Sequence, residues 1–270
     1  LKYSKLMFFL KIIGSILILY LAIIFTIFIS QRKLLYHPTE NNYLDQVNLN
    51  HQIEKINVNS DHKLEGWYYK KNKNFKTLLF FHGNAGKLDN RIYKLNEISK
   101  LDLNYLIVSY RGFNGNEGSP FENGLYKDAD AAKSWLNKKN INNQDIILYG
   151  ESLGTAVAVN LATNNDFAGI ILESPFTSMI ELAKKYYPYI PVKLLLKDKY
   201  DTIKKINLIT CPILIMHGRK DDIVPFYMGV EIFDKANKPK SSYFNDYDDH
   251  MMDFNKDLIN SINSFIKSLN

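Results

Sequence analysis

The longest apolar stretch of the chain lies near its beginning. Residues 12–31 read IIGSILILYLAIIFTIFISQ and contain no charged side chain. Twenty residues of α-helix rise about 30 Å, which is the thickness of a bilayer's hydrocarbon core. A signal peptide typically has a shorter apolar region of roughly 7–15 residues. The pattern therefore predicts a retained membrane anchor over residues 1–33, with a cleaved signal peptide or a buried core helix as the alternatives.

A different pattern follows this stretch. Residues 53–58 and 64–70 have the composition of two strands joined by a turn at 60–62. Short, almost unbroken apolar runs then recur at 77–81, 105–109, 145–149, 168–172 and 212–216. Such runs are typical of parallel strands that are buried on both faces. A further strand is expected at 240–245.

Stretches of helical length separate these runs at 88–100, 123–139 and 152–163, and a last one follows at 254–268. In the second of them, small and apolar residues share one helical face: Leu125, Ala129, Ala132 and Leu136. Alternating strands and helices predict an α/β domain with a mostly parallel sheet over residues 34–270. Residues 174–210, with three prolines and a tyrosine cluster, interrupt the alternation. We expect them to form a small cap insertion over the carboxyl edge of the sheet.

The net charge changes its meaning once it is mapped on the chain. The formal charge of +6 first indicates an anionic partner such as nucleic acid. However, residues 1–36 carry five basic and no acidic side chains, whereas the remainder carries 29 basic and 28 acidic ones. The charge therefore flanks the apolar stretch and does not predict a nucleic-acid-binding protein. The single cysteine, Cys211, excludes an intramolecular disulfide and a CxxC zinc site.

The basic flanks also bear on location. Lys2, Lys5 and Lys11 precede the apolar run, and Arg32 and Lys33 follow it. This distribution slightly favours a domain outside the cytoplasm but leaves the side of the membrane open. The expected location is the inner membrane of a bacterium.

The sequence Gly150-Glu151-Ser152-Leu153-Gly154 matches the GxSxG motif. It directly follows the apolar run 145–149 and opens the small-residue helix 155–162. This placement between a strand and a helix is what a nucleophile elbow requires, so Ser152 is the candidate nucleophile. An ordinary glycine-rich turn is the alternative.

A serine hydroxyl needs a base, and in this architecture the order is serine, acid, histidine. Only His217 and His250 follow Ser152. His217 ends a predicted buried strand, whereas His250 lies in a polar loop after the last strand, so His250 is the predicted base. Asp221, in the loop after strand 212–216, is the preferred acid; Asp222 and Glu173 are the alternatives.

Acyl transfer also needs donors for the oxyanion. The backbone N–H of Leu153, after the nucleophile, is the first candidate. The second is the backbone N–H of Asn84, in the loop His82-Gly83-Asn84-Ala85-Gly86 after strand 77–81. We expect His82 to fix this loop and to have no catalytic role. These residues need no cofactor and no metal.

Six motifs in this order resemble a known family. They are QRKLLYHPT after the apolar stretch, FHGNAG, SYRGFNGNEGSP, LYGESLGTAVA, ESPFTSM and HGRKDDIVP. The chain resembles the membrane-anchored serine hydrolases of the α/β-hydrolase superfamily, of the bud-emergence and abhydrolase-domain-containing type. The resemblance implies Asp221 as the triad acid and His250 as the base. It departs from the family at Asp249 and Met251, where a glycine and an asparagine are usual.

The resemblance implies activity on acyl esters or thioesters, often of lipids or acylated proteins. It leaves the acyl chain and the oligomeric state open. Because one fold supports several chemistries, a peptidase or another hydrolase acting on small substrates is an alternative. A non-catalytic, membrane-tethered binding protein is the other.

Overall fold

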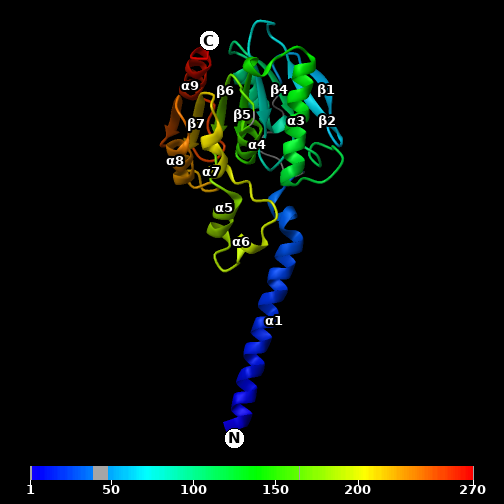
Figure 1. Ribbon diagram of the computed structural model, residues 1–270, viewed down its shortest axis with the longest axis vertical. Coiled ribbons are helices and arrows are strands. Elements are labelled where there is room, and N and C mark those ends of the chain that lie inside the picture. The colour runs from blue at the N-terminus through cyan, green and yellow to red at the C-terminus, as the bar shows by residue number, and fades with distance from the viewer. Residues whose placement is uncertain (1, 39–47, 164, 270) are drawn as a thin grey trace.

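A computed structural model describes residues 2–38, 48–163 and 165–269. Its first element, helix α1 (Lys2–Leu35), projects from the body of the molecule as a stalk (Figure 1). Residues Lys5–Leu35 have a mean hydropathy of 2.9 in their most apolar window, and none of that window is buried. The alternative of a buried core helix is therefore wrong. By length and composition, α1 can cross a membrane.

The body is built around one mixed sheet of eight strands in the order β1-β2-β4-β3-β5-β6-β7-β8. Strands β1 and β2 pair antiparallel, as do β2 and β4, and all other neighbours pair parallel. The strands are β1 (Glu54–Asn59), β2 (Lys63–Tyr69), β3 (Thr77–Phe81), β4 (Asn104–Val108), β5 (Ile146–Glu151), β6 (Gly169–Glu173), β7 (Ile213–Gly218) and β8 (Lys240–Asn245).

Helices cover both faces of this sheet, as the alternating pattern predicts. They include α2 (Ile92–Ile98), α3 (Glu122–Lys138), α4 (Leu153–Ala162), α8 (Phe226–Lys235) and α9 (Lys256–Lys267). The other helical segments are η1 (Leu88–Arg91), η2 (Asn143–Asp145), α5 (Met179–Tyr186), α6 (Val192–Leu195), α7 (Thr202–Lys205) and η3 (Ile206–Leu208). We call residues 174–210, which contain α5, α6, α7 and η3, the cap segment.

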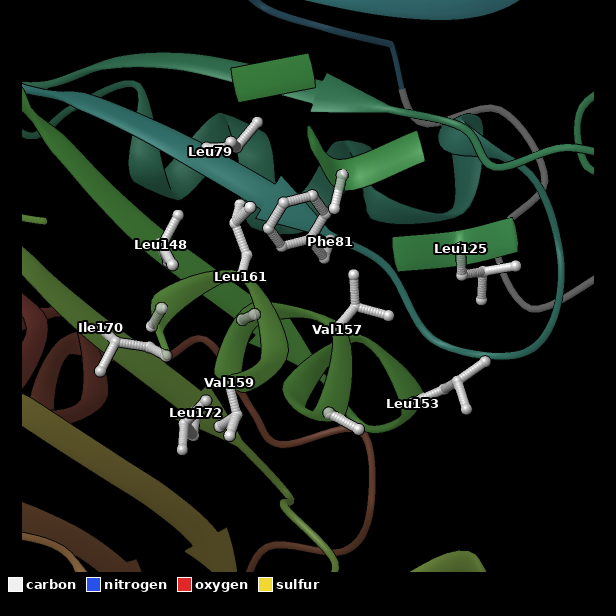
Figure 2. Packing of buried hydrophobic residues seen from close by; sticks show 14 of the residues in the cluster. Leu79, Phe81, Leu125, Leu148, Leu153, Val157, Val159, Leu161, Ile170 and Leu172 are labelled. Carbon is white, nitrogen blue, oxygen red and sulfur yellow. The ribbon is translucent and has the colours of Figure 1, made fainter. Parts of the chain in front are cut away.

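Two apolar clusters form the core, one on each face of the sheet. Because successive strand residues point to opposite faces, Leu79 and Phe81 of β3 enter one cluster and Leu78 and Phe80 the other. The first cluster joins the sheet to α3, α4 and α8, and Figure 2 shows how closely α4 packs on the central strands. The second joins the sheet to α2 and α9. The central strands are buried on both faces, which explains their unbroken apolar runs.

Most predicted elements lie within two residues of the observed ones. The stretch predicted as one helix at 88–100 divides into η1 and α2 and ends at Ile98. Helix α8 has no counterpart among the predicted elements. Strand β5 continues to Glu151, which brings Ser152 directly to the carboxyl edge of the sheet.

Candidate active site

Ser152 lies in a tight turn between β5 and α4. Its φ of 50° and ψ of −113° are strained for a residue with a side chain. A Cβ atom at Gly154 would lie 2.0 Å from the carbonyl oxygen of Phe81, and one at Gly150 would lie 2.5 Å from the carbonyl oxygen of Gly154. Both glycines of the motif are therefore required by close backbone contact, and the turn presents the serine at the sheet edge.

The structure brings Ser152, His250 and Asp221 together from three separate loops at this edge. His250 Nε2 lies 3.0 Å from Ser152 Oγ, and His250 Nδ1 lies 2.8 Å from Asp221 Oδ2. All three side chains are largely buried. With the proton of the neutral imidazole on Nδ1, toward the carboxylate, Nε2 is free to accept the serine proton.

The carboxylate of Asp221 has further partners. Its Oδ1 accepts the backbone N–H groups of Ile223 (3.0 Å) and Val224 (2.7 Å), and its Oδ2 lies 3.0 Å from His217 Nε2. Burial opposes the charge, but the hydrogen bonds from His217 and His250 outweigh it and hold the pKa of Asp221 below its usual range. Asp221 is thereby fixed as an oriented anion.

His217 is a contributor that the sequence reasoning missed. It is fully buried at the end of β7, and its Nε2 also lies 3.0 Å from the carbonyl oxygen of Val224. The spacing His217–Asp221 was visible in the sequence, but the loop geometry that turns the aspartate back onto the histidine was not. A Cβ at Gly229 of α8 would lie 2.3 Å from His217 Nδ1, so that glycine makes room for the ring.

The two alternative acids lie in other environments. Asp222 is exposed, and its backbone carbonyl oxygen accepts hydrogen bonds from the ammonium group of Lys185 and the hydroxyl group of Tyr186. Glu173 is buried but bonds to Lys94 at 2.6 Å and to the hydroxyl of Tyr149. The structure gives neither carboxylate a hydrogen bond to His250 within the described residues.

The two predicted oxyanion donors line a cavity of about 60 Å³ beside Ser152. Leu153 is the first residue of α4, so its N–H has no acceptor within the helix and points out of its N-terminus. Asn84 lies in the loop after β3. The other lining residues are apolar: Leu35, Phe176, Met179, Leu182, Ile223 and Val224. The cavity thus combines a few polar groups around the serine with an apolar wall.

The end of α1 holds the loop that contains Asn84. Asn84 Nδ2 donates to the carbonyl oxygen of Leu35 at 2.8 Å, and the N–H of His37 donates to the Asn84 carbonyl at 2.8 Å. The N–H of Gly86 donates to the carbonyl of His37 at 3.0 Å. The residues directly after the stalk are therefore built into the candidate oxyanion loop, which no sequence motif indicated.

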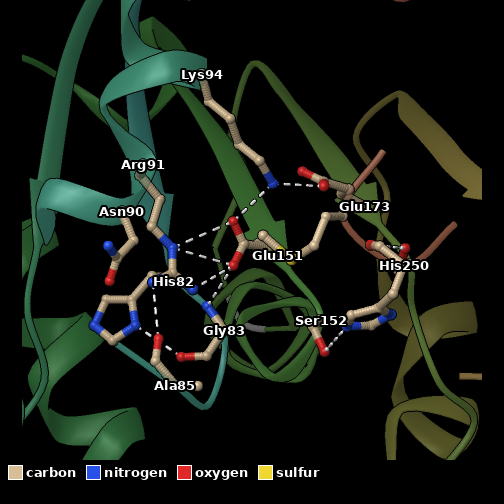
Figure 3. Close-up of polar contacts among 12 residues, drawn as sticks. His82, Gly83, Ala85, Asn90, Arg91, Lys94, Glu151, Ser152, Glu173 and His250 are labelled. Atoms are coloured by element: carbon tan, nitrogen blue, oxygen red, sulfur yellow. Dashed lines mark hydrogen bonds and ion pairs between the residues drawn. The ribbon is translucent and has the colours of Figure 1, made fainter. Parts of the chain in front are cut away.

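A buried ionic cluster lies beneath the nucleophile turn (Figure 3). Glu151, next to Ser152, bonds to Arg91 at 2.5 Å and to Lys94 at 2.8 Å, and it accepts the N–H of Gly83 at 3.1 Å. Burial alone would raise the pKa of Glu151, but the two cations outweigh it and hold that pKa well below its usual range. The cluster ties the nucleophile turn to the oxyanion loop.

His82 shares in fixing this loop, as the sequence led us to expect. Its Nδ1 bonds to the Gly83 carbonyl at 2.7 Å, and its ring packs at 4.3 Å between centroids against Tyr110. Burial, with the nearby Arg91, lowers the pKa of His82 to about 3. The ring is therefore neutral.

Comparison with known proteins places this geometry in a family. The model of the Prolyl oligopeptidase family matches residues 94–251, more than half of the chain. The uncharacterized protein Rv2307c of Mycobacterium tuberculosis is 33% identical over 236 residues, covering 86% of this chain and 84% of its own. Human alpha/beta hydrolase domain-containing protein 17B is 35% identical over 173 residues, 60% of this chain and 56% of its own.

Zebrafish (Danio rerio) lysophosphatidylserine lipase ABHD12 is 34% identical over 196 residues, 65% of this chain and 51% of that protein. Among solved structures, the esterase Pf2001 of Pyrococcus furiosus superposes with a TM-score of 0.70 at 18% identity, covering 87% of this chain and 97% of that one. At that identity the likeness shows the fold alone. Together with the family match, these findings show that the chain belongs to the prolyl oligopeptidase family of the α/β-hydrolase superfamily.

Proposed function

We propose that the protein is a membrane-anchored serine hydrolase that cleaves carboxylic ester or thioester bonds of acyl substrates through an acyl-enzyme. The observation that carries this proposal is the position of His250, within hydrogen-bonding distance of both Ser152 Oγ and Asp221 Oδ2. An ordinary glycine-rich turn would not require a strained serine aimed at a buried imidazole.

The chemistry follows from this geometry. Ser152 Oγ attacks the acyl carbonyl carbon as its proton passes to His250 Nε2, and the imidazolium is stabilised by Asp221. The carbonyl oxygen becomes an oxyanion that accepts the N–H groups of Leu153 and Asn84. When the tetrahedral intermediate collapses, His250 returns the proton to the leaving alcohol or thiol.

Water completes the cycle. It attacks the acyl-enzyme as His250 Nε2 takes one of its protons, and the second collapse releases the carboxylic acid and returns the proton to Ser152 Oγ. Every proton therefore moves through one imidazole nitrogen. No further group is needed in either half-reaction.

The cavity beside Ser152 supports an acyl substrate. Its walls are apolar, with Phe176, Met179 and Leu182 from the cap segment on one side and Leu35 from α1 on another. The name of one relative, lysophosphatidylserine lipase ABHD12, also supports a lipid ester as the substrate. Peptide cleavage is the second candidate activity, because the family model that matches the chain is that of the prolyl oligopeptidases.

A graded series of p-nitrophenyl acyl esters, with aminoacyl anilides measured in parallel, tests the proposal. We expect turnover of the esters by the full chain, no turnover by the Ser152→Ala variant, and little cleavage of the anilides. Preferential cleavage of the anilides would contradict ester hydrolysis as the main activity and would support the peptidase hypothesis. Equal ester turnover by the wild type and the Ser152→Ala variant would contradict the assignment of Ser152 as the nucleophile.

The proposed anchor is α1. Its unburied apolar surface supports membrane insertion, and its last residues are bonded into the body, so removal by cleavage after residue 31 would leave Leu35 and His37 in place. The expected compartment is the inner membrane of a bacterium.

A further inference from the structure

Part of the cap segment, with α5 and α6, runs down along α1 (Figure 1), whereas α7 and η3 pack on α4 and α8 of the body. Contacts between α1 and the cap segment follow one another in the same chain direction along both segments. They join Tyr20 to Tyr189 (2.7 Å), Gln31 to Leu195 (3.3 Å) and Lys197 (2.7 Å), Arg32 to Asp198 (2.9 Å), and Tyr36 to Tyr200 (2.7 Å). Tyr20 lies sixteen residues before Tyr36, which is about 24 Å along an α-helix. The cap segment therefore extends well down the stalk.

This path brings the cap segment level with the apolar part of α1. Tyr20 lies inside the uncharged run 12–31, and its hydroxyl donates to the backbone carbonyl of Tyr189. A bilayer that surrounds this run consequently reaches Tyr189 as well. The hydrogen bond also satisfies both polar groups at a depth where water is scarce.

The tip of the cap segment has the surface composition of a membrane-interface element. Tyr189 is 86% exposed and Leu194 85% exposed, and Tyr186 and Tyr187 are also exposed. Between residues 179 and 197 there are four lysines and one acidic residue, Glu181. A tyrosine ring is apolar except for its hydroxyl group, and lysine side chains extend toward lipid phosphates. Several exposed aromatic and aliphatic side chains gathered on one short segment mark an interaction surface.

We infer that the tip of the cap segment, residues 187–196, inserts into the phospholipid leaflet that surrounds the upper part of α1. Tyr189 and Leu194 contact acyl chains, while Lys193 lies near lipid phosphates. This inference rests on the proposed role of α1 as the membrane anchor. It goes beyond that role, because it gives the cap segment its own lipid contact.

The insertion has a consequence for the candidate active site. The cavity beside Ser152 is bounded by Leu35 at the end of α1 and by Met179 and Leu182 of α5. Helix α1 contains the apolar run that would be embedded, and α5 is followed directly by the tip of the cap segment. The cavity therefore lies close to the membrane surface, so an acyl chain of the leaflet would have a short path to the nucleophile.

Lipid-resolved fluorescence quenching tests the insertion on the full chain. Single cysteines are placed at Leu194→Cys, at Ile18→Cys in α1 and at Ser264→Cys in α9, each in a Cys211→Ser background, and labelled with bimane. The proteins are reconstituted in vesicles of phosphatidylcholine and phosphatidylglycerol, with and without brominated acyl chains. We expect strong quenching at positions 18 and 194 and none at position 264.

The three positions separate failure of the inference from failure of the anchor. Quenching at 18 without quenching at 194 overturns cap insertion and leaves the anchor intact. A label at 194 that is shielded from aqueous iodide but not quenched by bromolipid indicates a protein partner, which also overturns the inference. Absence of quenching at 18 contradicts the proposed anchor itself.

A matched pair of variants gives an independent readout. Leu194→Glu introduces a charge at the inserted tip, whereas Leu208→Glu introduces one at another exposed leucine of the cap segment, in η3. We expect Leu194→Glu to lower turnover of a long-chain ester in vesicles about fivefold, because a charge opposes insertion, and to leave a soluble short-chain ester unaffected. Equal effects of both variants on both substrates would contradict the inference.

Discussion

At the scale of single residues, the candidate site depends on how Asp221 is held. Its two oxygens receive two backbone N–H groups and two imidazole N–H groups, from His217 and His250. The carboxylate therefore cannot turn away from His250 without losing several bonds at once. Such an arrangement fixes the tautomer of the imidazole before a substrate arrives.

The first prediction concerns acid stability. Because the folded pKa of Asp221 lies below its unfolded value of about 3.9, its charge stabilises the fold above that pH. This contribution is lost as the pH falls from the unfolded toward the folded pKa. We expect Asp221→Asn to be less stable than wild type by about 1–2 kcal/mol at pH 7, with the difference narrowing below about pH 4. Urea unfolding at several pH values measures it, and a difference that is constant with pH would argue against the assignment.

The second prediction concerns the side chain of Asn84. Asn84→Ala removes the bond from Nδ2 to the Leu35 carbonyl but keeps the backbone N–H that we assign to the oxyanion hole. A loop displaced by even 1 Å aligns its donor poorly, so kcat should fall about ten- to a hundredfold with little change in KM. Gln31→Ala is the control, since it removes contacts of α1 to the cap segment and one bond within α1 but none to the loop of Asn84. If KM rises and kcat is kept, Asn84 contacts the substrate instead.

At the scale of elements, the turn from β5 to α4 is the most constrained part of the site. The backbone of Gly154 approaches β3 so closely that no side chain fits between them. Strand and helix therefore meet at a fixed distance, and the serine between them has one orientation. The Arg91–Glu151–Lys94 cluster supports the turn from beneath.

A third prediction tests this contact. Gly154→Ala would place its Cβ 2.0 Å from the Phe81 carbonyl oxygen, so β3 or α4 must move. We expect a loss of about 3 kcal/mol or more in the free energy of unfolding, together with loss of activity. Gly14→Ala, in α1, serves as the control, because apart from the adjacent helix backbone no atom lies within 4 Å of the added carbon. Similar melting temperatures for the two variants would contradict the packing argument.

Elements of regular pattern were predictable, and contacts between distant loops were not. The unbroken apolar runs of β3 to β7 and the single apolar face of α3 follow from burial, which acts on each segment by itself. Ser152 and His250 could be selected by motif and chain order. His217 and Leu35 could not, because their place at the site depends on loop paths that no local pattern encodes.

At the scale of the whole molecule, the sequence's basic charge describes location more than substrate. Five basic residues flank the apolar helix, while the rest of the chain is nearly neutral. The stalk and the cap segment lie side by side and both carry exposed apolar side chains. The site beside Ser152 is where they meet the body.

A fourth prediction follows for membrane attachment. We expect the full chain to stay in the membrane pellet through alkaline carbonate extraction, because α1 as the proposed anchor would bury about 30 Å of apolar helix in the bilayer. A chain that begins at Arg32 keeps the contacts of Arg32, Leu35 and Tyr36 with the body but lacks this helix. It should be released by carbonate. Release of the full chain would contradict the anchor.

The most direct test of the central claim is covalent labelling with a fluorophosphonate probe, followed by mass spectrometry of the labelled peptide. The account predicts one adduct, on Ser152, that is lost in Ser152→Ala and strongly slowed in His250→Ala, because the hydroxyl then lacks its base. Slowed labelling of His250→Ala supports the account only if this variant is folded, so its folding is checked in parallel. A folded wild-type protein that is not labelled, or one labelled at a serine other than Ser152, would contradict the account.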